Sequence, residues 1–596
     1  MQGLRPNLVA AACSGALVGA ALGLSRLRGG LAAVWGPAAW LDLPLAALAG
    51  ALVGLGVAML VELLGRLAAR VGAWRFALAA GSVLVVLFAV AAWGVAGRTA
   101  LPAADRARAA VASPDRRPDV VVIIYDAVRA DLLDADGHLP PAWAPNLRRL
   151  AERGETFTAA RAPAPWTLPS HASLFTGLSP LTHGAIEETP VLRDELVTLA
   201  ERFREAGYTT IGLCANPWLS RRRGFAQGFD AWIELWRHRG DVPLLFPMVR
   251  PVARLGLVES EDPRLDKGAR LATRLAERVV ARQPDDVPLF LFINLVDAHP
   301  PYAAPGEDRL RLVPPEVLEA GIDPLRVSQD WRAILAGEVE LGVLEQRALR
   351  GLVAGEIAYM DRYLGRIIAA FERRDRFDGA AFVVTSDHGA ALGERRRLGS
   401  GFDLSEEMLR IPMVAHWPGD RAAGTRRGDP VYLHDLAPTL LGLAGLAAPV
   451  PPGDLAVTRE GRALDALPPR AAGLSAYARP LGILENMWRR YPRFDASFLD
   501  RRLLAIHDGR YKLVWSSRDG EELVDTAGGR DRVVTGGQPA REARLHHLLV
   551  SVAGAEPALA WERTLESMHA TSGEALATHS ETREMLRSLG YVDDGS

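Results

Sequence analysis

Cysteine is nearly absent from this sequence of 596 residues, which contains only Cys13 and Cys214. Cys13 lies in an apolar run and Cys214 lies far away, so the pair supports neither a disulfide framework nor a cysteine metal site. An excess of charge of one sign is also lacking, because 69 Lys and Arg stand against 71 Asp and Glu. The chain therefore lacks the basic surplus of nucleic-acid-binding domains, and no nucleic-acid partner is expected.

Charged residues are scarce in three stretches of the first 98 residues. Leu8–Leu24 and Phe76–Val95 carry no charge, and Leu43–Leu64 carries only Glu62. Each stretch approaches the roughly 20 apolar residues that cross a bilayer. We predict a transmembrane region of about three helices over residues 1–98, and hence a multi-pass protein of the cell membrane. A buried helical domain is the alternative. The flanking arginines leave orientation nearly balanced, and we expect the rest of the chain to be extracytoplasmic.

Short β-branched runs alternate with helical patterns after a predicted linker at residues 99–118. We expect strands at residues 119–125, 208–214, 289–296 and 381–386, and helices at 144–154, 195–206, 266–281 and 344–371. The strands are apolar throughout, which is typical of strands that are covered on both faces. The pattern predicts an α/β fold, a doubly wound sheet with helices on both faces.

Polar side chains follow three of these strands. Asp126 ends the first run, Asp297 and His299 follow the third, and Asp387 and His388 follow the fourth. An acidic residue at one strand end can be a simple turn former. Three polar ends together indicate a shared cleft, because ligands bind beyond the carboxyl ends of such strands. Asp126, Asp387 and His388 offer oxygen and nitrogen ligands for one divalent cation.

The segment Ala164–Gly177 reads Ala-Pro-Trp-Thr-Leu-Pro-Ser-His-Ala-Ser-Leu-Phe-Thr-Gly. It combines hydroxyl groups and a histidine with a helix start near Ser170. The N-terminus of a helix offers free N–H groups to an anion. A hydroxyl held there beside a metal ion can lose its proton and attack phosphorus or sulfur.

These segments together resemble a known family. Thr167–Gly177 resembles the sulfatase nucleophile signature, Cys/Ser-x-Pro-Ser-Arg followed by Leu/Phe-Thr-Gly. Five further segments match the family in the right order: Val121–Asp131 (opening strand), Asn294–Tyr302 (His-x-Pro-Tyr segment), Thr385–Gly389 (second metal segment), His434–Gly445 (Asp-x-x-Pro-Thr helix) and Arg510–Leu513 with Glu522–Asp525 (C-terminal strand pair). The chain thus resembles the sulfatase-like branch of the alkaline-phosphatase superfamily from about residue 118 to 525.

The resemblance implies a mixed sheet of the alkaline-phosphatase type and a role for each site residue. Asp126, Asp387 and His388, together with Thr167, would bind one divalent ion, either Ca²⁺, Mn²⁺ or Zn²⁺. Thr167 would also be the nucleophile. His299 would hold a substrate oxygen or assist the leaving group. His171 stands where sulfatases place an arginine and would contact the nucleophile or the anion. The implied substrate is an anionic phosphate or sulfate ester, with lipids and envelope polymers among the candidates.

The departures from the family pattern narrow the chemistry. Thr167 cannot become the formylglycine of sulfatases, because its carbinol carbon bears a methyl group. Threonine relatives include membrane-anchored phosphoglycerol and phosphoethanolamine transferases. Ala127, Ala390 and Ser400 stand where relatives often carry Asp, Glu and His. We therefore predict a membrane-anchored, metal-dependent hydrolase with a covalent threonine intermediate. The alternatives are a phospho-group transferase that modifies envelope lipids or polymers, and a catalytically weakened binding protein.

The pattern also predicts the division of the chain beyond the membrane. Residues 119–450 would form the catalytic domain, 451–535 a C-terminal subdomain with a small sheet, and 536–596 a helical tail that packs on the catalytic domain. Arg129 and Asp131 are expected to form a local ion pair behind the site. The basic run Arg395–Arg397 is either a solvated surface or an attractor of anionic lipid or polymer.

Overall fold

The structure, a computed structural model, describes residues 117–132, 144–238, 265–328, 331–446, 464 and 472–569. The predicted transmembrane helices fall within residues 1–98, outside the described residues, and stay a prediction. In the part of the chain that is described, no helix has both the length and the apolar character needed to cross a membrane. The predicted linker is described only at its last two residues.

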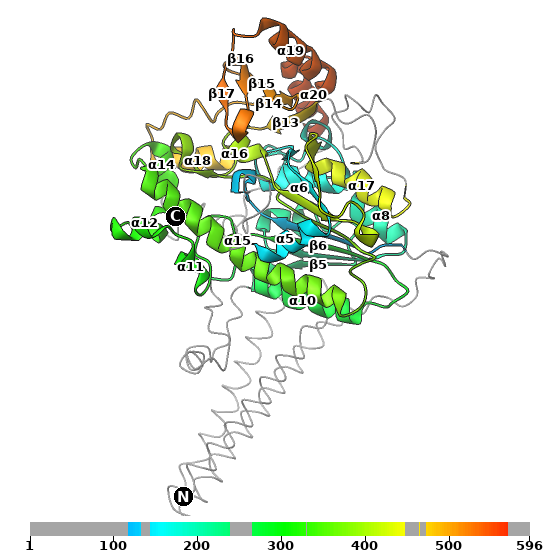
Figure 1. The fold of residues 1–596 in the computed structure, drawn as a ribbon. Helices are drawn as coiled ribbons and strands as arrows, with labels where there is room; N and C mark the ends of the chain where they lie inside the picture. The colour runs from blue at the N-terminus through cyan, green and yellow to red at the C-terminus, as the bar shows by residue number, and fades with distance from the viewer. Residues whose placement is uncertain are drawn as a thin grey trace, which may run out of the picture. The chain divides into compact units, whose positions relative to one another are not determined.

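An eight-stranded mixed sheet forms the centre of the part of the chain that contains helices α5 to α17 (Figure 1). Its strand order is β11-β2-β10-β7-β1-β6-β4-β5. Its strands are β1 (Val120–Tyr125), β2 (Glu155–Phe157), β4 (Thr209–Cys214), β5 (Ala231–Glu234), β6 (Leu289–Leu295), β7 (Ala381–Thr385), β10 (Met413–His416) and β11 (Thr425–Arg427). The strands β7, β1, β6, β4 and β5 run parallel, whereas β10 is antiparallel to β7 and β2. The four predicted strands are thus present and lie side by side in the sheet.

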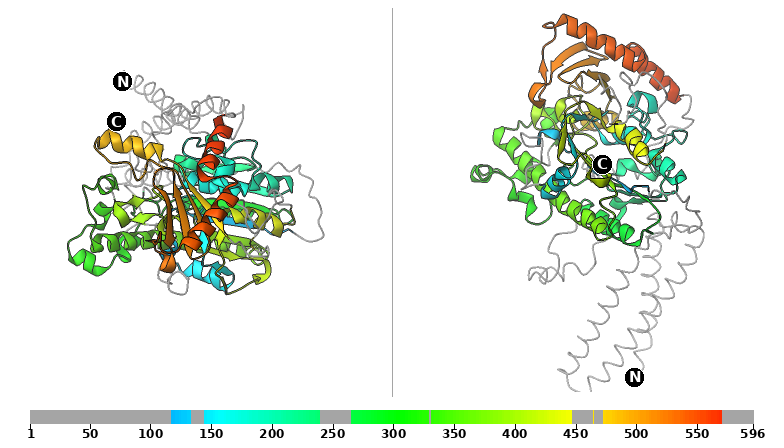
Figure 2. Two further views of the ribbon diagram at one scale, coloured as in Figure 1. Left: turned by 90° about the horizontal axis from the view of Figure 1, so that it is seen from above. Right: turned by 45° about the vertical axis from the view of Figure 1, so that its right-hand side comes forward.

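Helices cover both faces of this sheet (Figures 1 and 2). On one side lie α5 (Pro145–Glu152), α10 (Ala269–Arg282) and α15 (Val343–Glu372); on the other lie α6 (Thr167–Thr176), α8 (Leu199–Glu205) and α17 (Leu436–Leu443). Val120, Val122 and Ile124 of β1 belong to the core that includes α6, α8 and α17. All six residues of β1 are buried, because alternate side chains enter the two covered faces. The predicted α/β architecture is confirmed.

A second, antiparallel sheet follows in the chain, with the order β13-β14-β15-β16-β17. It consists of β13 (Gly473–Tyr477), β14 (Leu503–His507), β15 (Tyr511–Ser516), β16 (Gly520–Asp525) and β17 (Arg532–Val533), and is followed by α19 (Pro539–Ala553) and α20 (Pro557–His569). The Ala476 amide donates to the Pro163 carbonyl at 2.9 Å, which joins β13 to the segment before Thr167. The Thr564 hydroxyl of α20 donates to the Leu181 carbonyl at 2.9 Å.

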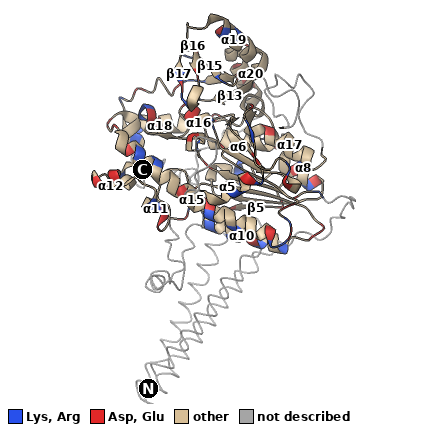
Figure 3. Ribbon diagram, viewed as in Figure 1, with Lys and Arg blue, Asp and Glu red and all other residues tan. Residues whose placement is uncertain are grey.

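Charged residues of both signs occur along outer helices such as α8 and α10 (Figure 3). This mixture agrees with the near-neutral net charge of the sequence.

Candidate active site

The turn after β1 positions the first acidic group. Asp126 has no exposed surface, and its amide donates to the Leu295 carbonyl of β6 at 2.9 Å. Ala127 follows with a φ of 64°, a left-handed conformation that is unusual for a residue other than glycine. Its amide donates to Asp387 Oδ1 at 3.2 Å. The strained turn therefore links the ends of β1 and β7 and brings the two carboxylates together.

The turn after β7 supplies the second acidic group and an imidazole. His388 Nδ1 lies 2.8 Å from the Gly389 carbonyl, which can only accept, so Nδ1 carries the hydrogen and Nε2 presents its lone pair. Gly389 is required here, because a Cβ on it would lie 2.0 Å from the Glu407 carbonyl oxygen. Burial raises the pKa of Asp387 well above its usual range, and the neighbouring Asp126 raises it further. Burial also lowers the pKa of His388.

Thr167 is the first residue of α6, and its side chain faces these groups. Trp166 precedes the helix in an extended conformation, and Gly177 ends it with a φ of 72°. The Thr167 hydroxyl lies 3.3 Å from His388 Nε2. The free N–H groups and the positive end of the helix dipole favour negative charge at this position. The hydroxyl is thus placed where an anionic nucleophile would be stabilised.

Asn216 is a site residue that the sequence interpretation missed. It lies just beyond β4, and its Nδ2 donates to Asp126 Oδ2 at 2.7 Å and to Thr167 Oγ1 at 3.1 Å. Asn294 of β6 donates a second hydrogen bond to Asp126 Oδ2 at 3.1 Å. Thr167 Oγ1 therefore accepts from Asn216, which leaves its own proton directed to His388 Nε2. The polar ends of four neighbouring strands, not three, meet at this rim of the sheet.

The two further predicted histidines lie in different surroundings. His171 Nδ1 donates to the Thr167 carbonyl at 2.9 Å and lies 3.5 Å from Asp387 Oδ2. Its ring meets Phe292 edge-on, and burial lowers the pKa of His171 to about 4, so the ring is neutral. His299 follows β6, and its charge when protonated lowers the pKa of His388, although burial is the main cause of that shift. No hydrogen bond between Thr167 and His299 is present.

The donor set fits a divalent cation. One oxygen of each carboxylate, Asp126 Oδ1 and Asp387 Oδ2, is buried and has no hydrogen-bond partner among the described residues. These oxygens lie 3.7 and 3.3 Å from His388 Nε2. The ligand atoms of the three residues lie within 4.8 Å of one another. None of the described Lys and Arg side chains pairs with either carboxylate, so a metal would supply the positive charge that both buried groups need in order to be ionised together.

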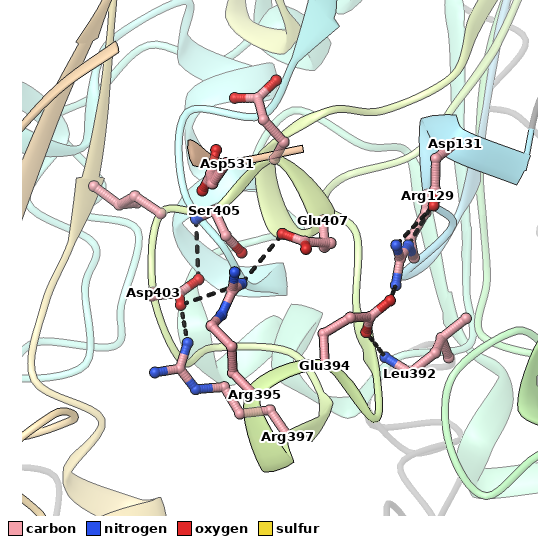
Figure 4. A network of polar contacts seen from close by, with 12 residues as sticks. Arg129, Asp131, Leu392, Glu394, Arg395, Arg397, Asp403, Ser405, Glu407 and Asp531 are labelled. Carbon is pink, nitrogen blue, oxygen red and sulfur yellow. Dashed lines mark hydrogen bonds and ion pairs between the residues drawn. The ribbon is translucent and has the colours of Figure 1, made fainter. Parts of the chain in front are cut away.

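The loop after His388 is held by two groups of ion pairs (Figure 4). Arg129 pairs with Asp131 at 2.7 Å, as expected from the sequence, and also with Glu394 at 2.8 Å. Its Nη1 also donates to the carbonyl of Ala390, at 3.1 Å. Farther along the loop, Arg395 pairs with Glu407 at 3.2 Å, and Arg397 pairs with Asp403. The basic run is therefore largely engaged by acidic neighbours. Ser400 and Ala390, both departures from the family pattern, are buried in this loop.

Comparison with known proteins identifies the family. The family model described as "Sulfatase" matches residues 118–446, more than half of the chain. The chain belongs to the sulfatase family. The resemblance inferred from the sequence is confirmed, as is its assignment to an enzyme family that cleaves sulfuric or phosphoric esters. Sulfatase family members use a divalent metal ion, and the cluster of Asp126, Asp387 and His388 is the candidate site for it.

Individual relatives place the chain within this family. It is 27% identical over 391 residues to the multifunctional alkaline phosphatase superfamily protein PehA of Trinickia caryophylli, an alignment that covers 56% of this chain and 75% of PehA. It is 26% identical over 440 residues to the choline-sulfatase of Rhizobium meliloti, which covers 69% of this chain and 80% of that enzyme. The crystal structure of the phosphonate monoester hydrolase of Agrobacterium radiobacter superposes with a TM-score of 0.55 at 23% identity, and covers 74% of this chain and 96% of that one. The last similarity shows the shared fold.

Proposed function

We propose that this sulfatase-family chain is a metal-dependent hydrolase of phosphate or sulfate esters that uses Thr167 as a covalent nucleophile and is anchored in a membrane by the apolar stretches of residues 8–95. One observation carries the proposal. The Thr167 hydroxyl, two buried carboxylate oxygens without partners and the His388 lone pair all converge at the rim of the sheet. A catalytic domain fixed beside a bilayer would act on esters at its outer surface.

Asp126, Asp387, His388 and Thr167 would hold the cation. When bound, the ion would screen a non-bridging oxygen of the ester and lower the pKa of the Thr167 hydroxyl. The imidazole ligand favours Zn²⁺ over Ca²⁺, which prefers oxygen ligands alone, and the two carboxylates are also suited to Mn²⁺. Asn216 would donate to Thr167 Oγ1 more strongly once that oxygen is charged, because hydrogen bonds to charged acceptors are shorter and stronger.

The proposed reaction proceeds in two displacements. Thr167 releases its proton to solvent, and its oxygen attacks phosphorus or sulfur while the bond to the leaving alcohol breaks. Protonated His299 gives its Nε2 proton to the departing oxygen, since its Nδ1 hydrogen is bound to the Pro300 carbonyl at 2.9 Å. Water then transfers a proton to His299 Nε2 and attacks the phospho- or sulfo-threonine, and Thr167 Oγ1 departs. Thr167 Oγ1 regains a proton from solvent, phosphate or sulfate leaves the site, and Thr167 and His299 are back in their starting protonation states.

Phosphate esters are the favoured substrates within this class. Thr167 cannot supply the aldehyde hydrate through which formylglycine sulfatases release sulfate. The covalent ester on Thr167 must therefore be cleaved at its phosphorus or sulfur by water. The chain is similar in sequence to a choline-sulfatase and shares its fold with a phosphonate monoester hydrolase, so sulfate esters and phosphorus esters both belong in the first assays.

The test uses the full chain in detergent with 4-nitrophenyl methyl phosphate and 4-nitrophenyl sulfate, with Mn²⁺ or Zn²⁺ added. Thr167→Ala should abolish turnover, and Thr167→Ser should retain part of it because the hydroxyl remains. Intact-mass analysis after acid quench should show a phosphorylated peptide that contains Thr167.

Thr176→Ala is the matched control on the same helix. The Thr176 hydroxyl donates to the Ala172 carbonyl at 2.7 Å, and Thr176 lies at the opposite end of α6 from Thr167. Its activity should equal that of the wild type. Turnover that persists in Thr167→Ala would reject the nucleophile.

A further inference from the structure

The loop that carries His299 is bound by two charged side chains from distant parts of the chain, one of them fully buried. Lys267 lies just before α10, and Glu356 lies in the middle of α15. Lys267 Nζ donates to the carbonyl of Asp297 at 2.7 Å and to that of His299 at 2.8 Å. Glu356 Oε1 accepts from the Ala303 amide at 2.7 Å. The two side chains thus form hydrogen bonds with the loop backbone before and after the His299 ring.

Lys267 and Glu356 are also bound to each other. Lys267 Nζ donates its third hydrogen bond to Glu356 Oε1 at 3.0 Å, so each of its three N–H donors has a defined acceptor. The Lys267 amide donates to Asp297 Oδ1 at 3.1 Å. Glu356 has no exposed surface, and the Lys267 side chain is 16% exposed. The pair is therefore held in one geometry and acts on the loop as a single unit.

Stability alone is a poor reason for this arrangement. Removing two charges from water is costly, and buried ion pairs often contribute no more than well-packed apolar side chains of similar volume. The ion pair instead fixes the position of the loop backbone. Each hydrogen bond has a fixed donor and acceptor, whereas an apolar contact would let the loop slide. The backbone position of this loop matters because it orients the His299 ring. His299 Nδ1 is hydrogen-bonded to the carbonyl of the next residue, Pro300, at 2.9 Å. The ring is thus oriented by the backbone that Lys267 and Glu356 hold.

We propose that Lys267 and Glu356 are positioning residues that hold His299 Nε2 at the leaving oxygen of the substrate. This inference rests on the proposed function, in which His299 protonates the leaving group. Neither residue would touch the substrate. Each would act through the backbone of residues 297–303.

The proposal predicts a defect that depends on the leaving group. Displacement of the general acid His299 lowers the rate most when the leaving alcohol has a high pKa, because such an alcohol must be protonated as it departs. 4-Nitrophenolate departs without help, whereas phenolate departs slowly. A displacement of about 1 Å can cost on the order of 100-fold in rate. We therefore expect Glu356→Ala to lower kcat on phenyl methyl phosphate by about 30- to 100-fold, and kcat on the 4-nitrophenyl ester by less than about threefold.

Further variants separate positioning from general support of the fold. Glu356→Gln keeps an oxygen for the Ala303 amide and should recover part of the phenyl-ester activity. Lys267→Met should reproduce the leaving-group dependence of Glu356→Ala. In a His299→Ala background, Glu356→Ala should lower kcat by less than about twofold more, because the two changes remove the same contribution.

Asp119→Asn is the control for the loss of a buried ion pair. Asp119 precedes β1, at the opposite end of that strand from the site, and pairs with Arg376 at 2.6 Å. Asp119→Asn should change kcat on the phenyl ester and on the 4-nitrophenyl ester by the same factor. Circular dichroism and thermal unfolding would establish that each variant is folded.

The outcomes distinguish this inference from the proposed function. If His299→Ala impairs the phenyl ester selectively but Glu356→Ala and Lys267→Met impair both esters equally, the positioning role is wrong and the proposed function stands. An additive effect of Glu356→Ala in the His299→Ala background would also overturn the positioning role. If Thr167→Ala retains activity, the proposed function itself fails. If His299→Ala leaves the phenyl ester unaffected, the acid assignment and the positioning role fail together.

Discussion

Asn216 offers a sharp test of the site, because a single amide group contacts both a metal-ligand candidate and the nucleophile. Its Nδ2 donates to Asp126 Oδ2 at 2.7 Å and to Thr167 Oγ1 at 3.1 Å. Asn216→Ala removes both bonds. A hydrogen bond to a charged group contributes about 1.5 to 3 kcal/mol. If Thr167 Oγ1 is charged in the transition state, kcat on 4-nitrophenyl methyl phosphate should fall about 10- to 150-fold.

The loss of activity must be separated from a loss of stability. The Asn216 side-chain oxygen also accepts from the Trp218 amide at 3.0 Å, so Asn216→Ala removes a cap as well. Asn216→Asp keeps this acceptor and the shape of the side chain but replaces the donor with an oxygen that faces Asp126. We expect it to be at least as inactive as Asn216→Ala in steady-state assays at saturating metal.

Asn146→Ala is the matched control for this test. Asn146 Nδ2 donates to Asp361 Oδ2 at 3.0 Å, in a similar asparagine–aspartate contact between α5 and α15. Its kcat should equal that of the wild type while its melting temperature falls. A kcat within threefold of the wild type for Asn216→Ala would show that the amide does not stabilise a charged Thr167.

Three further predictions concern the metal, the strained turn and a buried ion cluster. EDTA should abolish activity and added Zn²⁺ or Mn²⁺ should restore it, and Asp387→Asn should raise the metal concentration for half-maximal rate, as measured by titration of the apoprotein. Ala127→Gly should raise the free energy of unfolding by up to about 1 kcal/mol, because glycine adopts a φ of 64° without strain; a lower melting temperature would contradict this. Glu406 is buried, and although burial opposes its charge, Arg161 and Lys512 hold the pKa of Glu406 well below its usual range. Its stabilising contribution is therefore present above about pH 5 and lost as the pH falls below the usual glutamate pKa, so the urea midpoint of Glu406→Gln should depend less on pH between roughly 5 and 3 than that of the wild type.

The fold was predictable to the extent that its elements are local and periodic. The expected helix at residues 344–371 is α15 (Val343–Glu372), and the expected strand at 289–296 is β6 (Leu289–Leu295). Both have long, regular apolar patterns that the tertiary structure reinforces. Short strands such as β2 and β11 were not predicted, because three residues carry too little pattern. Their places are set by pairing with distant partners.

The site residues that carry charge were predictable from one rule, that polar residues which follow buried parallel strands meet at one edge of the sheet. Asn216 was missed because the rule was applied to charged residues alone. Asp126, Asp387 and His388 were found because charged residues after buried strands are conspicuous. Asn216 follows β4 in the same way, but a neutral amide draws no attention in a search for charges. Lys267 and Glu356 carried no local signal at all. One lies in a loop and the other within a long helix, and only the tertiary fold brings them to the His299 loop.

The contrast between buried carboxylates supports the case for a cation. Glu406 and Asp119 are buried like Asp387, and each has an Arg or Lys partner within hydrogen-bonding distance. In these two cases the protein neutralises a buried carboxylate with its own basic side chains. Asp126 and Asp387 have no such partner in the described part of the chain, although their free oxygens face the same imidazole nitrogen. Because a pair of unneutralised buried charges is too costly to retain for stability, the arrangement points to a positive charge that comes from outside the polypeptide.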